Sequence, residues 1–357
     1  MISHTLDQLG WTAARAQQFE QYAAAGLLPA RVIRPERGAC VVAGDGAVTT
    51  ARLQLDLSAA LSAAALPTVG DWVACSPDDG RGPAVRAVMP RTSAFLRHAV
   101  GGDTVAQALA ANVDTVFVVV PLNRKLNLTR IERFLTLGWE SGATPVLLLS
   151  KADVCDDLPA ALEAASSAAP GVDVLTVSAV VGDGVPEVLD LVTAGATIAL
   201  LGQSGAGKST LVNALAGENL MATQEIRSAD GRGRHTTTHR ELLVLPAGGI
   251  LIDTPGLRTL LLWDAEEGLE RAFEDVEQYV AHCRFHDCGH RTEPGCAVLA
   301  AVASGELPAR RVESHRKLQS ELAFLANKQD KRLQSEQRKN IRVLSKAYRQ
   351  RDQLKPR

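Results

Sequence analysis

One stretch decides how the centre of this chain folds: Gly202-Gln203-Ser204-Gly205-Ala206-Gly207-Lys208-Ser209. It has the pattern G-x-x-x-x-G-K-[ST], follows an apolar run at 197–201 that predicts a buried strand, and precedes a helical segment at 209–215. In such a loop, backbone N–H groups surround a phosphate chain at a helix N-terminus. Lys208 would reach the β- and γ-phosphates, and the Ser209 hydroxyl would ligate Mg²⁺. The sequence therefore predicts a nucleoside triphosphate site, to which we also assign Thr210.

Strands and helices alternate upstream of this phosphate loop. Continuous apolar runs predict buried parallel strands, and apolar residues at helical spacing predict helices between them. The predicted strands cover 112–120, 145–149 and 172–177, and the predicted helices cover 128–141, 158–169 and 185–192. This alternation is typical of a doubly wound α/β domain.

Two strand ends in this region carry groups suited to reading a nucleobase. Ser150-Lys151-Ala152-Asp153 follows the second predicted strand, and Ser178-Ala179 follows the third. In such sheets, ligands bind at the carboxyl ends of the strands. The Asp153 carboxylate can accept hydrogen bonds from N1–H and N2–H₂ of guanine, a donor pair that adenine lacks, and backbone N–H groups near Ala179 can meet the guanine O6. The alternative is that Asp153 only caps a helix.

Two segments after the phosphate loop predict contacts to Mg²⁺ and to the γ-phosphate. Residues 230–239 are polar and rich in glycine, and such a loop can bring a threonine hydroxyl, here Thr237, to the metal ion. The predicted strand at 249–253 ends in the pattern D-x-x-G, so Asp253 would hold Mg²⁺ through water and the Gly256 N–H would sense the γ-phosphate. The alternative is an ordinary strand and turn with a capping aspartate.

The N-terminal third predicts a short helical segment followed by a small β-domain. Residues 1–29 have apolar side chains at roughly helical intervals, and short β-like runs then alternate with Gly, Pro and Asp turns over residues 30–100. These runs cover 31–34, 39–43, 48–53, 72–75 and 84–88. A five-stranded oligonucleotide-binding (OB-like) barrel fits this size, although the pattern does not separate it from another small β-domain.

A late Cys/His cluster predicts a structural metal site. It reads Cys283-x₄-Cys288-x-His290-x₅-Cys296. Three thiolates and one imidazole match a closed tetrahedral zinc site that supplies folding energy to its segment. Free core cysteines are the alternative, and His282 and His286 lie near enough in sequence to leave the fourth ligand open.

Charge and hydropathy limit the classes of protein. The formal net charge is −2, but the chain from 309 onward is crowded with Lys and Arg, which is typical either of a polyanion-binding tail or of a solvated helix face. No segment approaches the roughly 18 consecutive apolar residues of a membrane span, and the N-terminus lacks a secretory signal pattern. We therefore expect a cytoplasmic protein without a membrane partner.

In combination, these motifs resemble a known family. They are the signature elements of a guanine-nucleotide switch in permuted order, because the base-reading elements at Asp153 and Ser178 precede the phosphate loop, the threonine loop and D-x-x-G. With the barrel and the Cys/His cluster, they resemble the ribosome small-subunit-dependent GTPase A family. The resemblance implies a GTPase that acts late in maturation of the small (30S) subunit, binds its rRNA near the decoding region and is stimulated by the subunit.

The resemblance also gives an expected organisation. We expect an N-terminal helical segment at 1–29, an OB-like barrel at 30–100, a circularly permuted GTPase domain at 101–262, and an α-helical zinc domain with a basic tail at 263–357. We expect a monomer that binds GTP or GDP with Mg²⁺ and holds one structural Zn²⁺.

Two departures concern affinity and mechanism. The family usually has Asn where this chain has Ser150, which predicts weaker guanine-nucleotide affinity with retained specificity. No Gln follows Gly256 closely, so intrinsic hydrolysis should be slow, on the order of 10⁻³ s⁻¹ or below. The resemblance implies that His235 positions the attacking water, although a His that is merely solvated on its loop is the alternative.

Two other functions compete with this prediction. The first is a P-loop ATPase or small-molecule kinase, which Asp153 argues against. The second is an RNA-binding module that nucleotide stabilises without significant turnover. Nucleotide competition discriminates the first, and phosphate release in the presence of the small subunit discriminates the second.

Overall fold

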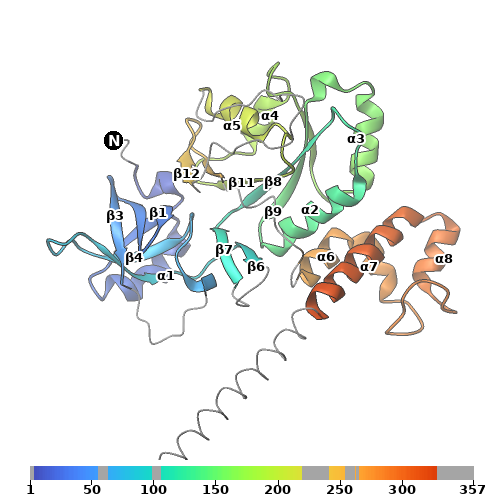
Figure 1. Cartoon of the computed structure of the whole chain (residues 1–357), viewed down its shortest axis with the longest axis horizontal. Helices are drawn as coiled ribbons and strands as arrows, with labels where there is room; N and C mark the ends of the chain where they lie inside the picture. The colour runs from blue at the N-terminus through green and yellow to red at the C-terminus, as the bar shows by residue number, and fades with distance from the viewer. Residues whose placement is uncertain are drawn as a thin grey trace, which may run out of the picture.

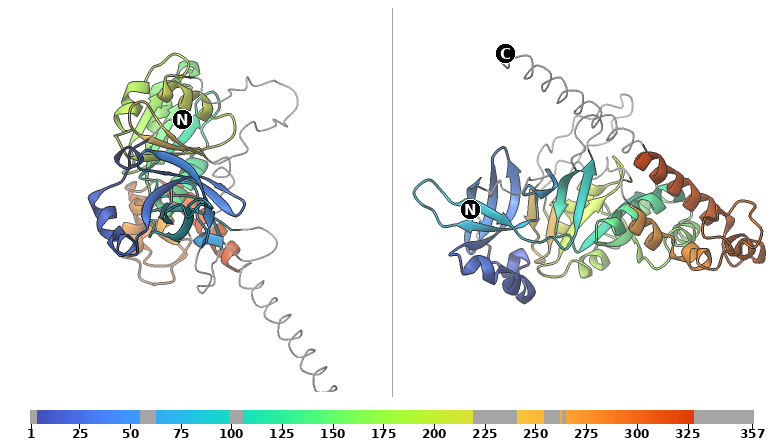
Figure 2. Two further views of the ribbon diagram at one scale, coloured as in Figure 1. Left: turned by 90° about the vertical axis from the view of Figure 1, so that its left-hand side faces the viewer. Right: turned by 90° about the horizontal axis from the view of Figure 1, so that it is seen from below.

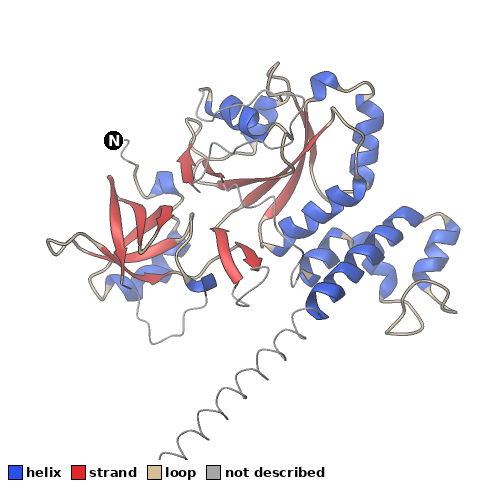
Figure 3. Cartoon of the chain, viewed as in Figure 1, coloured by secondary structure: helices blue, strands red, loops and turns tan. Residues whose placement is uncertain are grey.

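The computed structural model describes residues 4–54, 63–98, 106–218, 241–253, 262 and 265–327. A β-barrel, a sheet flanked by helices, and a group of helices follow one another along the long axis of the molecule (Figures 1 and 2). Figure 3 shows that the strands belong to the first two parts and that the C-terminal part is helical. Within the described residues, no helix is long and apolar enough to cross a membrane.

The N-terminal part is a closed barrel preceded by short helices. A 3₁₀ turn at Asp7–Leu9 and helix α1 at Ala13–Ala23 come first, and the Thr12 hydroxyl caps α1 by accepting from the Arg15 N–H at 3.3 Å. The barrel order is β1-β2-β3-β5-β4, in which only the β3–β5 pair is parallel among the paired strands. Its strands are β1 Leu28–Glu36, β2 Ala39–Gly44, β3 Ala47–Leu53, β4 Trp72–Ser76 and β5 Ala84–Val88. The predicted five-stranded barrel is confirmed.

A hairpin that the sequence did not predict lies between the barrel and the central sheet. Strands β6 Ala94–His98 and β7 Ala106–Ala111 pair antiparallel as a separate two-stranded sheet (Figure 1). Ser93 and Asn112, at its two ends, are joined by a hydrogen bond from the Asn112 N–H to the Ser93 carbonyl at 2.9 Å. The hairpin therefore returns the chain to the point from which the central sheet begins.

The central sheet has the order β10-β9-β8-β11-β13-β12. Strand β12 is antiparallel to its neighbour, and the other paired strands run parallel. The strands are β8 Thr115–Pro121, β9 Thr144–Ser150, β10 Val174–Val177, β11 Thr197–Leu201, β12 Glu241–Val244 and β13 Ile250–Asp253. The helices are α2 Leu128–Glu140, α3 Leu158–Ser167, α4 Val185–Asp190 and α5 Lys208–Ala216, with a 3₁₀ turn at Ala152–Val154. Another 3₁₀ turn, at Ala63–Ala65, lies between β3 and β4 of the barrel.

Alternate residues of each central strand face opposite layers of helices. In β8, Val116 and Val118 belong to the core shared with α2 and α3, whereas Phe117 and Val119 belong to the core shared with α4 and α5. Strands covered on both faces need apolar side chains at every position, which explains the continuous apolar runs. The predicted doubly wound domain is confirmed. From β8 and β11, which are neighbours, the chain leaves toward opposite faces, so a crevice is expected at their carboxyl ends.

The C-terminal helices pack against α2. They are α6 Glu266–Ala272, α7 Glu274–Val280, α8 Ala297–Ser304 and a further helix, the C-terminal helix, whose described part covers 309–327. Gly268 of α6 lies so close to α2 that an added Cβ would stand 2.3 Å from the Thr136 carbonyl oxygen. A single apolar core runs from the sheet through α2 into these helices, so the last part of the molecule is fixed to the sheet by side-chain packing.

One buried arginine fixes the barrel to the central sheet. The Arg31 side chain is 1% exposed, and its guanidinium donates to the carbonyl oxygens of Leu9, Gly70 (3.3 Å) and Asn112 (3.3 Å). It also donates to the Thr197 hydroxyl at 2.8 Å, at the first residue of β11. A buried charge is tolerated only when its donors are satisfied, so these contacts define one orientation of the barrel.

Candidate nucleotide site and metal cluster

The phosphate loop connects the end of β11 to the start of α5. Gly202 passes so close to β8 that an added Cβ would lie 2.4 Å from the Val119 carbonyl oxygen, and Gly207 has a left-handed φ of +88° at the N-cap of α5. Both positions therefore require glycine. The Lys208 ammonium donates to the carbonyl oxygens of Gly202 at 2.8 Å and Gln203 at 2.9 Å. The loop has the shape that the motif predicts, with its lysine folded over it.

The ends of β9 and β10 meet beside this loop. Asp153 lies in the 3₁₀ turn directly after β9, and its Oδ1 accepts a hydrogen bond of 2.6 Å from the Ser178 hydroxyl, which follows β10. A carboxylate oxygen has two lone pairs, so this bond leaves the carboxylate able to accept further donors while it fixes the side-chain rotamer. The structure thus brings together the two elements that the sequence assigned to one base-reading pair.

Ser150 connects the end of β9 to the phosphate loop. Its hydroxyl donates to the Ala206 carbonyl oxygen at 2.7 Å, and both residues are buried, at 5% and 1% exposure. The next residue, Lys151, has a left-handed φ of +61°, and its Cε lies 3.8 Å from an ideal Cβ on Gly207. Ser150 therefore contacts the phosphate loop through one hydrogen bond, and the weaker nucleotide affinity expected with serine in place of Asn stays a prediction.

The loop after Ser178 leaves few backbone donors for a base. The Ser178 N–H donates to the Asp183 carbonyl oxygen, and the Gly182 N–H donates to the Ser178 carbonyl oxygen, each at 2.8 Å. The Val181 N–H lies 3.3 Å from the Ser178 hydroxyl oxygen. In the part of the chain that the structure describes, the Ala179 and Val180 N–H groups have no such partner, so both are available to a carbonyl group such as O6.

The residues assigned to Mg²⁺ and catalysis are only partly described. Ser209 and Thr210 are the second and third residues of α5. Asp253 ends β13, which pairs with β11, so its backbone lies at the same sheet edge as the phosphate loop. Thr237, His235 and Gly256 lie outside the described residues.

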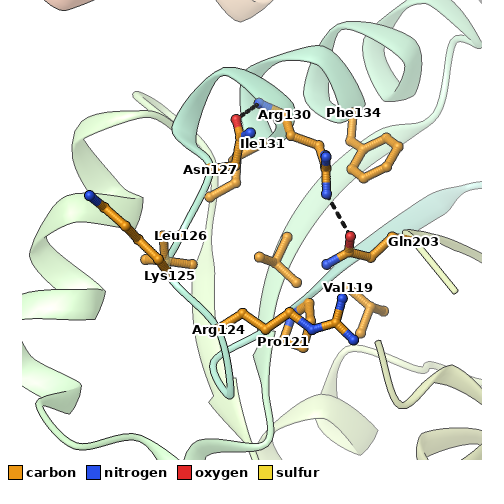
Figure 4. A pocket seen from close by; sticks show the side chains of 11 residues that line it. Val119, Pro121, Arg124, Lys125, Leu126, Asn127, Arg130, Ile131, Phe134 and Gln203 are labelled. Atoms are coloured by element: carbon orange, nitrogen blue, oxygen red, sulfur yellow. Dashed lines mark hydrogen bonds between the residues drawn. The ribbon is translucent and has the colours of Figure 1, made fainter. Parts of the chain in front are cut away.

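A small basic pocket lies at the end of β8, next to the phosphate loop. Its volume is about 80 Å³, and the residues that line it come from the end of β8, the following loop, α2 and Gln203 of the phosphate loop (Figure 4). The Arg130 Nη1 donates to the Gln203 Oε1 at 2.6 Å, and Arg124 and Lys125 also line the pocket. These residues were not predicted from the sequence, although three basic residues soon after a buried strand next to the phosphate-loop strand were a usable signal.

The four predicted metal ligands form one cluster. The ligand atoms of Cys283, Cys288, His290 and Cys296 all lie within 4.8 Å of one another. The His290 Nδ1 stands 3.6 Å from the Cys283 Sγ and 3.4 Å from the Cys296 Sγ, which identifies Nδ1 as the nitrogen that faces the cluster. His282 points elsewhere, because its Nδ1 lies 2.8 Å from the Gln278 carbonyl oxygen. Four thiolate and imidazole ligands around one point fit a tetrahedral metal ion such as Zn²⁺.

A carboxylate shapes the loop between these ligands. Glu293 accepts hydrogen bonds from the backbone N–H groups of Gly289 (3.0 Å), Arg291 (2.6 Å) and Thr292 (2.9 Å). These bonds favour the charged form and lower the pKa of Glu293 to about 2. His290 in turn has a left-handed φ of +52°, and its carbonyl oxygen accepts from Arg316 at 3.1 Å. The loop is thus held in a ligand-presenting conformation by contacts outside the cluster.

Comparison with known proteins places the chain in a family. A profile described as RsgA GTPase matches residues 88–263, and one described as 50S ribosome-binding GTPase matches residues 197–341. A small ribosomal subunit biogenesis GTPase RsgA of Streptomyces coelicolor is 50% identical over 343 residues, covering 94% of this chain and 92% of that protein. Its namesake in Streptomyces avermitilis is 49% identical over 343 residues, covering 95% and 91%.

Solved structures agree with this assignment. YjeQ from Thermotoga maritima matches with a TM-score of 0.63 at 26% identity, covering 83% of this chain and 99% of that chain. YloQ, a circularly permuted GTPase, matches with a TM-score of 0.59 at 23% identity, covering 85% and 96%, and supports the fold alone. The chain therefore belongs to the RsgA GTPase family and is a circularly permuted GTP hydrolase.

Proposed function

We propose that this chain is a GTP-driven switch in late maturation of the small ribosomal subunit. The chain binds the subunit, and the subunit stimulates GTP hydrolysis by the chain. The observation that carries the proposal is the contact between Asp153 and Ser178 beside the phosphate loop, because this pair offers a carboxylate to guanine at the place where a triphosphate binds. The relatives that match almost the whole chain are named for the small subunit, whereas the 50S description accompanies a match to 197–341 alone.

Each predicted site residue has a role in this proposal. The phosphate loop, Gly202 to Thr210, holds the triphosphate. Lys208 leaves its own carbonyl partners for the β- and γ-phosphates, and Ser209, Thr237 and Asp253 serve Mg²⁺. Asp153 accepts the two guanine donors, the Ala179 N–H meets O6, and Ser150 and Lys151 support the loop from the side of the base.

In this proposal, hydrolysis is triggered through two residues outside the described part of the chain, His235 and Gly256. His235 orients the attacking water once the subunit has ordered its loop, and the Gly256 N–H reports the γ-phosphate. As a test, His235→Ala should abolish subunit-stimulated turnover and leave GTP affinity unchanged. Stimulation equal to that of the unmodified protein would show that another group positions the water.

We further propose one structural Zn²⁺ at the Cys/His cluster and rRNA as the ligand of the C-terminal part. The structure refines which basic residues are available for RNA. Arg310 and Arg311 contact Glu132, and Arg316 contacts the His290 carbonyl oxygen, so these three side chains serve internal contacts. Lys317 is exposed on the C-terminal helix, and the remaining basic residues of the tail lie beyond residue 327, outside the described residues. RNA binding is therefore assigned to Lys317 and to that later part of the tail.

The deciding experiment is GTP turnover with and without purified small subunits. We expect slow basal phosphate release and strong stimulation by 30S particles, and we expect GTP but not ATP to compete for the site. Turnover of ATP would favour a kinase or ATPase, and nucleotide binding without stimulated release would favour a nucleotide-stabilised RNA-binding module. The proposal also includes a cytoplasmic monomer with the four-part division 1–29, 30–100, 101–262 and 263–357.

A further inference from the structure

Helix α2 stands between the phosphate loop and the C-terminal helix. On one side, Arg130 in its first turn donates to the side chain of Gln203 at 2.6 Å. On the other side, Thr129 and Arg133 contact the C-terminal helix. The Thr129 and Ser314 hydroxyl oxygens lie 3.0 Å apart, and Arg133 pairs with Glu321 at 2.6 Å. One helical turn therefore touches both the nucleotide-binding loop and the last described helix.

Gln203, which Arg130 contacts, also makes a hydrogen bond within the phosphate loop. The Gln203 backbone carbonyl accepts from Lys208, while its side-chain carbonyl accepts from Arg130. Gln203 is thus held from inside the loop by the lysine and from outside by α2. Figure 4 shows the Arg130 side chain directed at Gln203, whereas Lys125, in the same pocket, points away from it. Fixing this residue limits the conformations of the loop before any phosphate is bound.

The contact to the C-terminal helix is rigid. Glu132 and Arg311 are both fully buried and pair at 3.0 Å, and Arg310 adds a second guanidinium to the same carboxylate oxygen at 2.6 Å. Arg311 also donates to Asp275 and lies over the Phe273 ring, with its guanidinium carbon 4.2 Å from the ring centroid. Separating a buried charge from its partner is costly, so a displacement of the C-terminal helix carries the first half of α2 with it.

We propose that Arg130 is a positioning residue of the phosphate loop, through which α2 passes a displacement of the C-terminal helix to the bound nucleotide. The inference rests on the proposed function in one respect, namely that the loop binds GTP and GDP. It adds a route by which an event at the C-terminal part changes nucleotide exchange. This route runs through ordinary side-chain contacts and does not need the D-x-x-G segment.

The first arm of the test measures release of a fluorescent GDP analogue from the full-length protein. Arg130→Ala should raise the dissociation rate about three- to tenfold, which is less than a buried hydrogen bond with one charged partner would give, because Arg130 is exposed to solvent. Arg130→Lys should restore part of the difference. Lys125→Ala removes one positive charge from the same pocket without touching Gln203 and serves as the matched control. An equal effect of Lys125→Ala would show that net charge, and not the bond to Gln203, is responsible, and would overturn the inference.

The second arm tests the connection to the C-terminal helix. A variant that combines Arg310→Ala with Arg133→Ala loosens that contact at its two partly exposed ion pairs and keeps the buried Glu132–Arg311 pair. When Arg130 is present, these two substitutions should change the GDP dissociation rate. In the Arg130→Ala background, the same two substitutions should leave the rate unchanged. The same change in both backgrounds would refute transmission through Arg130. Failure of the unmodified protein to bind GDP would instead refute the proposed function, so the two failures are distinguishable.

Discussion

Ser150→Ala tests how the end of β9 supports the phosphate loop. The substitution removes the 2.7 Å bond to the Ala206 carbonyl oxygen and leaves that oxygen, in a residue only 1% exposed, without its side-chain partner. An unsatisfied buried acceptor costs about 1–3 kcal/mol. Without nucleotide the loop can relax to reduce this penalty, whereas bound phosphates hold the loop in one shape. Most of the cost should therefore appear in binding, as a rise of about 5- to 150-fold in the GDP dissociation constant.

Titration with a fluorescent GDP analogue measures this effect, and thermal unfolding of the same samples shows whether the variant is folded. Ser167→Ala is the matched control, because the Ser167 hydroxyl also donates to a backbone carbonyl, that of Ala164, at 2.7 Å, but on an exposed part of α3. The control should change GDP affinity by no more than about twofold. A folded Ser150→Ala protein with the same GDP affinity as this control would refute the idea that Ser150 braces the loop.

Three further changes test other parts of the molecule. Asp153→Asn should weaken GTP binding at least about a hundredfold and shift preference toward XTP, which competition binding measures, because an amide cannot accept both guanine donors. Cys288→Ser should lose the bound metal to a mild chelator, measured by elemental analysis, whereas Cys155→Ser, outside the cluster, should retain it. Arg311→Ala should lower the free energy of unfolding by about 3–5 kcal/mol in denaturant titrations, because Asp275 loses its arginine partner and the buried Glu132 keeps only the partly exposed Arg310. Arg310→Ala, at that partly exposed position, should cost about 1 kcal/mol or less.

Local pattern was sufficient to predict most of the fold. Strands β8, β9 and β11 are buried on both faces, so their sequences are continuously apolar and stand out from the helices between them. The phosphate loop was equally predictable, since Gly202 and Gly207 occupy positions where a Cβ is excluded by close approach or by backbone angle. Where each residue's own neighbours in the sequence determine its structure, the sequence predicts it well.

What escaped prediction depends on partners that are distant in sequence. The hairpin strand Ala106–Ala111 has the sequence AQALAA, which carries no strand pattern of its own and is fixed by pairing with β6. Arginine in a strand is usually exposed, yet Arg31 is buried, where it donates a hydrogen bond to the Thr197 hydroxyl, far along the chain. The hydroxyl of Ser150 likewise contacts Ala206, which is 56 residues further along the chain. Spacing motifs locate the phosphate loop but not the side chains that hold it.

These distant contacts place the phosphate loop between the two outer parts of the molecule. The barrel reaches β11 through Arg31, which bonds Thr197 at the start of the strand that ends at the loop. The C-terminal helix reaches the loop from the other direction, through Glu132 and Arg130 of α2. A large RNA surface that contacts both outer parts can therefore act on the loop from two sides without touching the nucleotide. If the small subunit stimulates hydrolysis as proposed above, such an arrangement makes nucleotide affinity, as well as hydrolysis, responsive to binding.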